Sequence, residues 1–161
     1  MGINKFTQHL LILSEDDAVR QVVLGFLLDD RVAIRRVQSL PVSGGCTKVR
    51  DAFLNDYAAS MLDFPLRHIL LVFDCDGDVD RIPQLQQQIP ADIRDRVFLL
   101  GSLHDPEALS RACGKKKEAI GKHLATECAE GSDALWSHEY LAHNQTEAAR
   151  LSDIVVPFMF K

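Results

Sequence analysis

Residues 67–78 read RHILLVFDCDGD, and this stretch decides the fold. Residues 67–73 form the most continuous apolar run of the chain, which is the pattern of a central strand in a parallel sheet covered on both faces. The run then ends in a group of acidic residues. Because open parallel sheets bind ligands beyond the carboxyl ends of their strands, this stretch indicates both an α/β fold and the place of a functional site.

Shorter apolar runs precede and follow this strand, and helical patterns separate them. We expect strands at residues 9–13 (HLLIL), 32–40 (VAIRRVQSL), 67–73 and 96–100 (RVFLL). We expect helices between them at about residues 18–28, 48–62 and 81–88. Strands that alternate with helices in this way predict right-handed βαβ units. The predicted fold class is therefore α/β, with a Rossmann-like parallel sheet of about four strands flanked by helices.

Beyond Leu103 the sequence changes to helical patterns. They cover about residues 105–113, 115–131 and 134–151. The apolar tail at residues 153–161 is expected to be an edge strand or a docked segment. At 161 residues and 18.0 kDa, the chain has the usual length of one domain. We therefore expect one domain over residues 1–161, with a core at about 9–103 and a helical C-terminal elaboration at about 104–161.

The composition restricts the functional classes. Hydrophobic residues make up 47% of the chain, which excludes an intrinsically disordered protein. The net charge of −5 provides no general attraction for nucleic acid, so binding of that kind must be local or assisted by a metal ion. The chain has no CxxC pair, no signal-peptide pattern and no apolar stretch long enough to span a bilayer. These features predict a cytoplasmic protein with reduced thiols and no membrane partner.

Acidic residues follow two of the expected strands. Glu15 follows the first strand, Asp74 and Asp76 follow the third, and Asp78 lies close behind. In an extended strand end, Asp74 and Asp76 would point to the same side, because side chains repeat every two residues. Two such carboxylates repel each other unless a cation lies between them. Hard oxygen ligands of this kind predict a Mg²⁺ or Mn²⁺ site.

An EF-hand does not account for these acids. A calcium loop that started at Asp74 would need glycine at its sixth position and glutamate at its twelfth. Those positions hold Val79 and Leu85, and Gly77 stands at the fourth position instead. We therefore reject a calcium loop.

The order of the motifs resembles the Toprim domain, the catalytic module of topoisomerases, bacterial primases, small nucleases and OLD-type nucleases. That family combines a strand ending in Glu, a glycine-containing loop after the second strand, and a strand ending in DxD. The matching residues are Glu15 in HLLILSE, Gly44 and Gly45 in PVSGG, and Asp74 and Asp76 in HILLVFDCD. The resemblance covers roughly the stretch from the first expected strand to the fourth. It implies a metal-dependent phosphoryl-transfer enzyme, above all a nuclease acting on DNA or RNA.

The resemblance also implies roles for individual residues. Asp74 and Asp76, together with Asp78, would hold Mg²⁺ or Mn²⁺. Glu15 would be a catalytic general acid or base, or a further metal ligand, and the sequence leaves both roles open. The family often has glycine directly after this glutamate, where this chain has Asp16.

The glycine-containing loop would contribute to substrate binding. Gly44 and Gly45, followed by Lys48, would approach the substrate phosphate, although a plain turn accounts for the glycines equally well. A chain of this size has few residues left to grip a long nucleic acid. A protein partner is therefore compatible with the proposed activity.

Two other families share parts of the pattern, and both alternatives stay open. VFDCDGD resembles the haloacid dehalogenase phosphatase motif, in which Asp74 would be the nucleophile and Asp76 the general acid. That motif normally lies on the first strand of the chain. LLILSEDDAVRQ resembles the start of a response-regulator receiver, with Asp74 as phosphoacceptor in a noncatalytic signalling or assembly module. Receivers require lysine after the penultimate strand, where this chain has Leu103 and His104.

Other polar residues have simpler structural explanations. His138 and His143 are separated by five positions, which does not match the spacing of a zinc-binding helix. We expect them on the flank of a helix that packs Trp136 on the sheet. Asp105 is expected to cap a helix, and Cys75 is expected to be buried on the face opposite Asp74.

Overall fold

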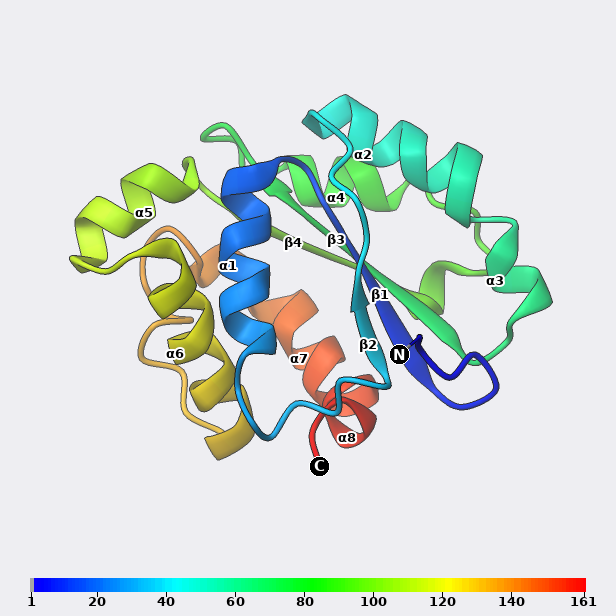
Figure 1. Ribbon diagram of the computed structural model, residues 1–161. Coiled ribbons are helices and arrows are strands. Elements are labelled where there is room, and N and C mark those ends of the chain that lie inside the picture. The colour runs from blue at the N-terminus through cyan, green and yellow to red at the C-terminus, as the bar shows by residue number, and fades with distance from the viewer. Residues whose placement is uncertain (1) are drawn as a thin grey trace.

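The computed structural model describes residues 2–161, with the side chains of Cys46 and Thr47 excepted. Within these residues a four-stranded parallel sheet forms the centre of the protein, in the order β2-β1-β3-β4 (Figure 1). The strands are β1 (His9–Ser14), β2 (Val37–Ser39), β3 (Arg67–Asp74) and β4 (Val97–Ser102). The predicted α/β class and parallel sheet are confirmed.

The strand order reverses between β1 and β3. The chain leaves β1 to form β2 on one side and then returns to form β3 on the other side. β1 and β3 pair in register from His9 opposite Arg67 to Ser14 opposite Val72. The two central strands therefore end side by side, at the point where parallel α/β sheets most often bind ligands.

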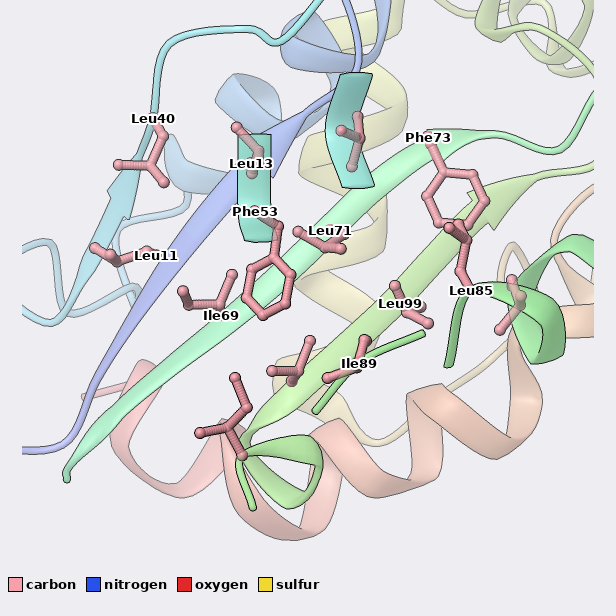
Figure 2. Packing of buried hydrophobic residues seen from close by; sticks show 14 of the residues in the cluster. Leu11, Leu13, Leu40, Phe53, Ile69, Leu71, Phe73, Leu85, Ile89 and Leu99 are labelled. Carbon is pink, nitrogen blue, oxygen red and sulfur yellow. The ribbon is translucent and has the colours of Figure 1, made fainter. Parts of the chain in front are cut away.

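One face of the sheet is covered by the helices that follow β2 and β3. These are α2 (Cys46–Ala52), the π-helical turn η1 (Phe53–Tyr57), α3 (Ser60–Asp63) and α4 (Arg81–Gln86). Phe53 packs among the side chains of the central strands, and Leu85 and Ile89 belong to the same apolar cluster beside β4 (Figure 2). This face is a continuous apolar core, because successive side chains of each strand alternate between the two faces.

The opposite face is covered by helices from both ends of the chain. α1 (Asp17–Leu27), α7 (Gln145–Ile154) and α8 (Val156–Met159) lie on the sheet, and α5 (Pro106–Cys113) and α6 (Lys117–Glu130) lie outside α1 (Figure 1). The short 3₁₀ turns η2 (Arg94–Arg96) and η3 (Ala142–Asn144) precede β4 and α7. Among the described residues, no helix is both long enough and apolar enough to cross a bilayer.

α1 and α6 cross at two glycines. A Cβ atom added to Gly121 would lie 1.9 Å from the backbone oxygen of Val22, and one added to Gly25 would lie 2.1 Å from that of Glu118. No side chain fits either space. The close approach fixes α6 against α1, so the helical C-terminal part helps to hold the first helix in place.

The outer edge of β4 is satisfied by side chains of α7 and η3. Asn144 accepts a hydrogen bond from the N–H of Gly101 (2.9 Å) and donates one to its oxygen (2.8 Å). Glu147 accepts a hydrogen bond from the N–H of Leu99 (3.0 Å). A bare strand edge leaves such backbone groups unpaired, and here a helix takes the place of a fifth strand.

The second strand is shorter than predicted, whereas the tail is a docked segment, one of the two forms that the sequence left open. β2 comprises only Val37–Ser39, because a turn at 33–36 closes with a hydrogen bond from the N–H of Arg36 to the oxygen of Ala33. Val32 instead forms an isolated antiparallel bridge with Phe160. The tail is thus mostly the short helix α8, and its end is anchored by this bridge.

The predicted helix at 134–151 is wrong in its first half, since α7 begins only at Gln145. The buried carboxylate of Glu127 accepts hydrogen bonds from the N–H groups of Leu135 (2.6 Å) and Trp136 (3.2 Å). These side-chain bonds organise the segment as a loop in place of a helical turn. In contrast, Asp105 caps α5 as predicted, through the N–H of Ala108 (2.7 Å).

Candidate functional site

The candidate site lies at the adjoining ends of β1 and β3. Glu15 directly follows β1, and its Oε2 atom accepts a hydrogen bond of 2.7 Å from the backbone N–H of Asp74, the last residue of β3. The backbone N–H of Glu15 in turn donates to the oxygen of Val72 (3.0 Å). Two acidic residues far apart in the sequence are thereby brought together.

The electrostatic environment disfavours negative charge on both residues. Burial raises the pKa of Glu15, and the neighbouring carboxylates of Asp16, Asp74 and Asp76 add to the rise, against the opposing effect of the Asp74 N–H. Burial likewise raises the pKa of Asp74, with Asp76, Asp105 and Asp16 contributing. Half-buried carboxylates in a group of like charges are stabilised by a proton or by a cation.

The residues after Asp74 form a tight turn. Asp76 and Gly77 have positive φ angles of 50° and 78°, and the N–H of Asp78 donates to the oxygen of Cys75 (2.9 Å). Positive φ at both central positions is the pattern of a type I′ turn, which Asp-Gly sequences favour. The prediction that Asp76 continues an extended strand beside Asp74 is therefore wrong.

The turn gives Asp76 and Asp78 partners of their own. Asp76 Oδ2 pairs with the guanidinium of Arg81 at 2.9 Å, and Asp78 Oδ1 accepts a hydrogen bond from the N–H of Asp80 (2.9 Å). Asp74 Oδ1 accepts one from the N–H of Asp76 (2.8 Å). Arg81 thus neutralises part of the acidic cluster, and no sequence pattern had indicated this ion pair.

The donor set partly fits the predicted divalent metal. Glu15 and Asp74 offer hard carboxylate oxygens at one place, which suits Mg²⁺ or Mn²⁺. Among residues 2–161, however, no group of three or more His, Cys, Asp or Glu side chains is arranged to hold a metal ion. A site with a third carboxylate would require Asp76 to leave Arg81.

The glycine-containing loop lies beside Glu15. The N–H of Gly44 donates to the backbone oxygen of Glu15 (2.7 Å), and that of Ser43 donates to Ser14 (3.1 Å). Gly44 has a φ of 94°, and Gly45 precedes α2 in an extended conformation. The Gly44 N–H thus takes part in the turn that the sequence allowed as an alternative, and the approach of this loop to phosphate stays a prediction.

Lys48 is the residue of this loop that offers a charge. Its side chain is exposed and folds back over the glycines, with its Nζ atom 3.9 Å from where a Cβ of Gly44 would lie. The loop thus carries an ammonium group beside the strand end that bears Glu15. This position is compatible with the phosphate contact predicted for Lys48, which stays a prediction.

Comparisons of the chain with protein-family models, with curated proteins and with solved structures found no match. The arrangement of the site residues therefore carries the functional argument.

Two histidines, His104 and His143, lie near the acidic turn. A Cβ on Gly77 would lie 3.8 Å from the ring of exposed His104, which contacts Tyr140 edge to face at 4.9 Å between centroids. His143 Nε2 lies 3.6 Å from the Sγ of Cys75, which is fully buried as predicted. His104 follows the end of β4, so the rule that identified Glu15 and Asp74 would have found it too.

Proposed function

We propose that this protein is a Toprim-like phosphoryl-transfer enzyme that depends on Mg²⁺ or Mn²⁺ and cleaves nucleic acid phosphodiesters. The observation that carries the proposal is the 2.7 Å hydrogen bond between Glu15 Oε2 and the Asp74 N–H. It joins the glutamate strand end to the DxD strand end, which are the two elements that the Toprim resemblance pairs. The reversal of strand order at the same point supports a ligand site there.

The energetics of the carboxylates support a cation at this site. Burying Glu15 and Asp74 together costs free energy, and a purely structural role would be filled better by neutral side chains. The raised pKa values of both residues express this cost. When bound, a divalent ion supplies charge stabilisation for a phosphoryl group. Glu15 and Asp74 would hold it, and Asp76 would join them after exchanging its bond with Arg81.

Glu15 has the properties of a proton carrier. A general acid or base works best when its pKa lies near the working pH, and the pKa of Glu15 is raised towards that range by burial. The hydrogen bond to the Asp74 N–H fixes one carboxylate oxygen of Glu15 and so orients the other. Glu15 would therefore exchange a proton with the attacking water or with the leaving oxygen.

Two cations flank the acids. Lys48 lies over the glycine-containing loop beside Glu15, and Arg81 lies against Asp76. Lys48 would donate to phosphate oxygens, and Arg81 would do so once Asp76 binds the metal ion in its place. These two cations do not offset the acidic cluster by themselves, so with a net charge of −5 nucleic acid would bind only after the divalent ion is in place.

The direct test is cleavage of supercoiled plasmid, single-stranded DNA and RNA in Mg²⁺ or Mn²⁺, with a chelator as blank. Glu15→Gln and Asp74→Asn should each lower the rate by about 10²-fold or more, the usual effect of removing a catalytic acid or base. Asp63→Asn, an exposed residue before the opposite end of β3, is the matched control and should cleave normally. Asp76→Asn is preferred to alanine, because asparagine tolerates the positive φ of the turn.

Other results would refute this function or support a different one. Cleavage that persists in both Glu15→Gln and Asp74→Asn would refute the proposal. Stable labelling of Asp74 by acetyl phosphate, without cleavage, would support a receiver-like module. Turnover of p-nitrophenyl phosphate that depends on Asp74 would support a phosphatase related to the haloacid dehalogenases.

A further inference from the structure

An apolar pocket lies on the face of the sheet that is covered by α1 and α7. It has a volume of about 380 Å³ and lies between the sheet and the helices α1, α6 and α7. Leu10, Ile12 and Leu70 form its floor, and Phe26 and Leu124 form part of its wall. The recess is open to solvent, since Ser132, Ser137 and Gln145 at its rim are exposed, and small-molecule sites are typically concave and mostly apolar in this way.

The pocket leaves the middle of the sheet incompletely covered. Val72 and Leu100 belong to neighbouring strands and line the pocket, yet both are only partly buried. Central strands of a parallel sheet are normally covered on both faces. The apolar residues on this side also form two separate clusters, one around Leu70 and Leu151 and one around Leu124 and Leu135. The pocket lies between residues of these two clusters.

The chemistry of the wall defines the kind of ligand. The described lining residues include no Lys, Arg or His, and the ionisable groups among them are Glu127, Asp133 and Cys128. Glu127 is already bonded to two backbone N–H groups, and burial raises the pKa of Cys128 to about 11, so its thiol stays neutral. An anionic head group would find no cationic side chain among the described lining residues and would lie near the carboxylates of Glu127 and Asp133. Neutral side chains such as Ser137 and Gln145 remain to receive a polar end.

We propose that this pocket binds a neutral amphiphile, a molecule with an apolar chain or ring system and one uncharged polar end such as a hydroxyl group. An apolar cavity of about 150 Å³ accommodates benzene, so the larger pocket here accommodates a longer body. Ligand sites of this type are concave and mostly apolar, with a few polar groups that fix orientation. The inference is independent of the proposed nuclease activity, because the pocket and the acidic site have no residue in common.

The only tryptophan of the chain, Trp136, lines the pocket and reports on it directly. We expect 10-bromodecan-1-ol to quench the fluorescence of Trp136 with a saturable dependence on concentration, because bromine quenches indole on contact. The matched 1-decanol should compete with it and restore the signal. Decanoate should bind at least about tenfold more weakly than the alcohol. Quenching that does not saturate, or a carboxylate that binds as tightly as the alcohol, would overturn the proposal.

A substitution that fills the pocket can be compared with a matched substitution outside it. Ala148 lines the pocket, whereas Thr146 on the same helix is exposed and does not. Ala148→Phe should weaken binding of 10-bromodecan-1-ol by about tenfold or more, and Thr146→Phe should bind as the unchanged protein does. Equal binding to both variants would contradict the assignment. Circular dichroism of each variant shows whether it is folded.

A measurement without any substitution makes the test independent of variant folding. In methyl NMR spectra, 1-decanol should shift the signals of Ile12 and Val72, which line the pocket. The signals of Leu11 and Leu71, on the opposite face of the same two strands, should stay in place. Shifts that are equal on both faces, or absent from both, would show that the pocket is not the binding site.

Discussion

The carboxylate of Glu147 accepts a hydrogen bond of 3.0 Å from the backbone N–H of Leu99, so a side chain of α7 occupies the place of a pairing strand beside β4. The same carboxylate also accepts hydrogen bonds from Gln86 (2.7 Å) and Arg150 (2.7 Å), and only 3% of Glu147 is exposed. The charge is therefore buried with three donors around it. Removal of this one group would leave all three donors without their acceptor.

We predict that Glu147→Ala lowers the free energy of unfolding by about 3–5 kcal/mol, the usual cost of removing one partner from a buried charged network. Urea unfolding followed by circular dichroism measures the change. Thr146→Ala, at the exposed neighbouring position, should have little effect. An unfolding midpoint in Glu147→Ala equal to that of the unchanged protein would show that the edge of β4 does not depend on this carboxylate.

We predict that Asn144 protects the backbone amide of Gly101 from hydrogen exchange. Asn144→Ala would remove the acceptor of the Gly101 N–H, at about 1–3 kcal/mol for a buried unsatisfied group, and one of the donors to the Gly101 oxygen. Amide hydrogen exchange at Gly101 should accelerate in this variant. The exchange rate of the Leu70 amide, inside the sheet, should change only as far as the global stability changes. Identical changes in exchange rate at Gly101 and Leu70 would argue against a local role of Asn144.

The neutral variants of the acidic site should be more stable than the unchanged protein at pH 7. Burial raises the pKa of Glu15 from its ordinary value of 4.5 and that of Asp74 from 3.8, so the charged forms lower the stability of the folded state. Glu15→Gln keeps an acceptor for the Asp74 N–H while it removes the charge. A higher Tm is the expected result.

The gain in thermal stability from replacing Glu15 by glutamine should become smaller as the pH falls. As the pH falls through the raised folded pKa towards the ordinary value, the folded unchanged protein takes up its proton first and its stability rises. The difference in Tm between Glu15→Gln and the unchanged protein should therefore shrink from pH 7 to about pH 4.5. A constant difference over this range would show that charge is not its cause.

Buried histidines should give the opposite dependence on pH. Burial lowers the pKa of His68 from 6.5, and the ring lies against Phe158 with 5.2 Å between centroids. Below about pH 6.5 the unfolded chain binds a proton at His68 before the folded protein does, so the free energy of unfolding falls as the pH falls. His68→Phe should reduce this slope between about pH 7 and 5. Unfolding titrations at several pH values provide the comparison, and an unchanged slope would assign it to other groups.

The crossing of α1 and α6 gives a steric prediction. Gly121→Ala would place its Cβ 1.9 Å from the backbone oxygen of Val22, and we expect at least about 1–3 kcal/mol of destabilisation from the forced separation. Gly131→Ala is the matched control, because nothing lies within 4 Å of an added Cβ there. Its positive φ of 73° should cost only about 1–2 kcal/mol. A Gly121→Ala variant as stable as the unchanged protein would mean that the helices can move apart freely.

The central part of the fold was predictable because its signals are local. The apolar run at 67–73 and the capping residue Asp105 each specify their element through neighbouring residues, and the structure agrees with them. The pairing of Glu15 with Asp74 was also predictable, because the carboxyl ends of parallel strands meet at one edge. These predictions needed only the direction of the strands.

The errors came from turns and side-chain contacts that the helix and strand patterns do not describe. The loop before α7 depends on Glu127, which captures amides that would otherwise belong to a helix. The orientation of Asp76 depends on a left-handed turn and on Arg81, and the extended-strand rule ignores both. The cover of the β4 edge by Asn144 and Glu147 has no periodic signature either, because it depends on how α7 docks.

The glycine crossing of α1 with α6 and the docking of α7 on β4 have a consequence for how this protein can be shortened. A fragment that stopped near Leu103 would retain all four strands, yet it would lose the helix that fixes α1 and the side chains that pair with β4. Such a fragment would expose unpaired backbone groups along β4 and an uncovered apolar face of the sheet, which together favour self-association. We therefore expect the two parts of this chain to fold together, because α1, which follows Glu15, is held in place by a helix that comes after the last strand.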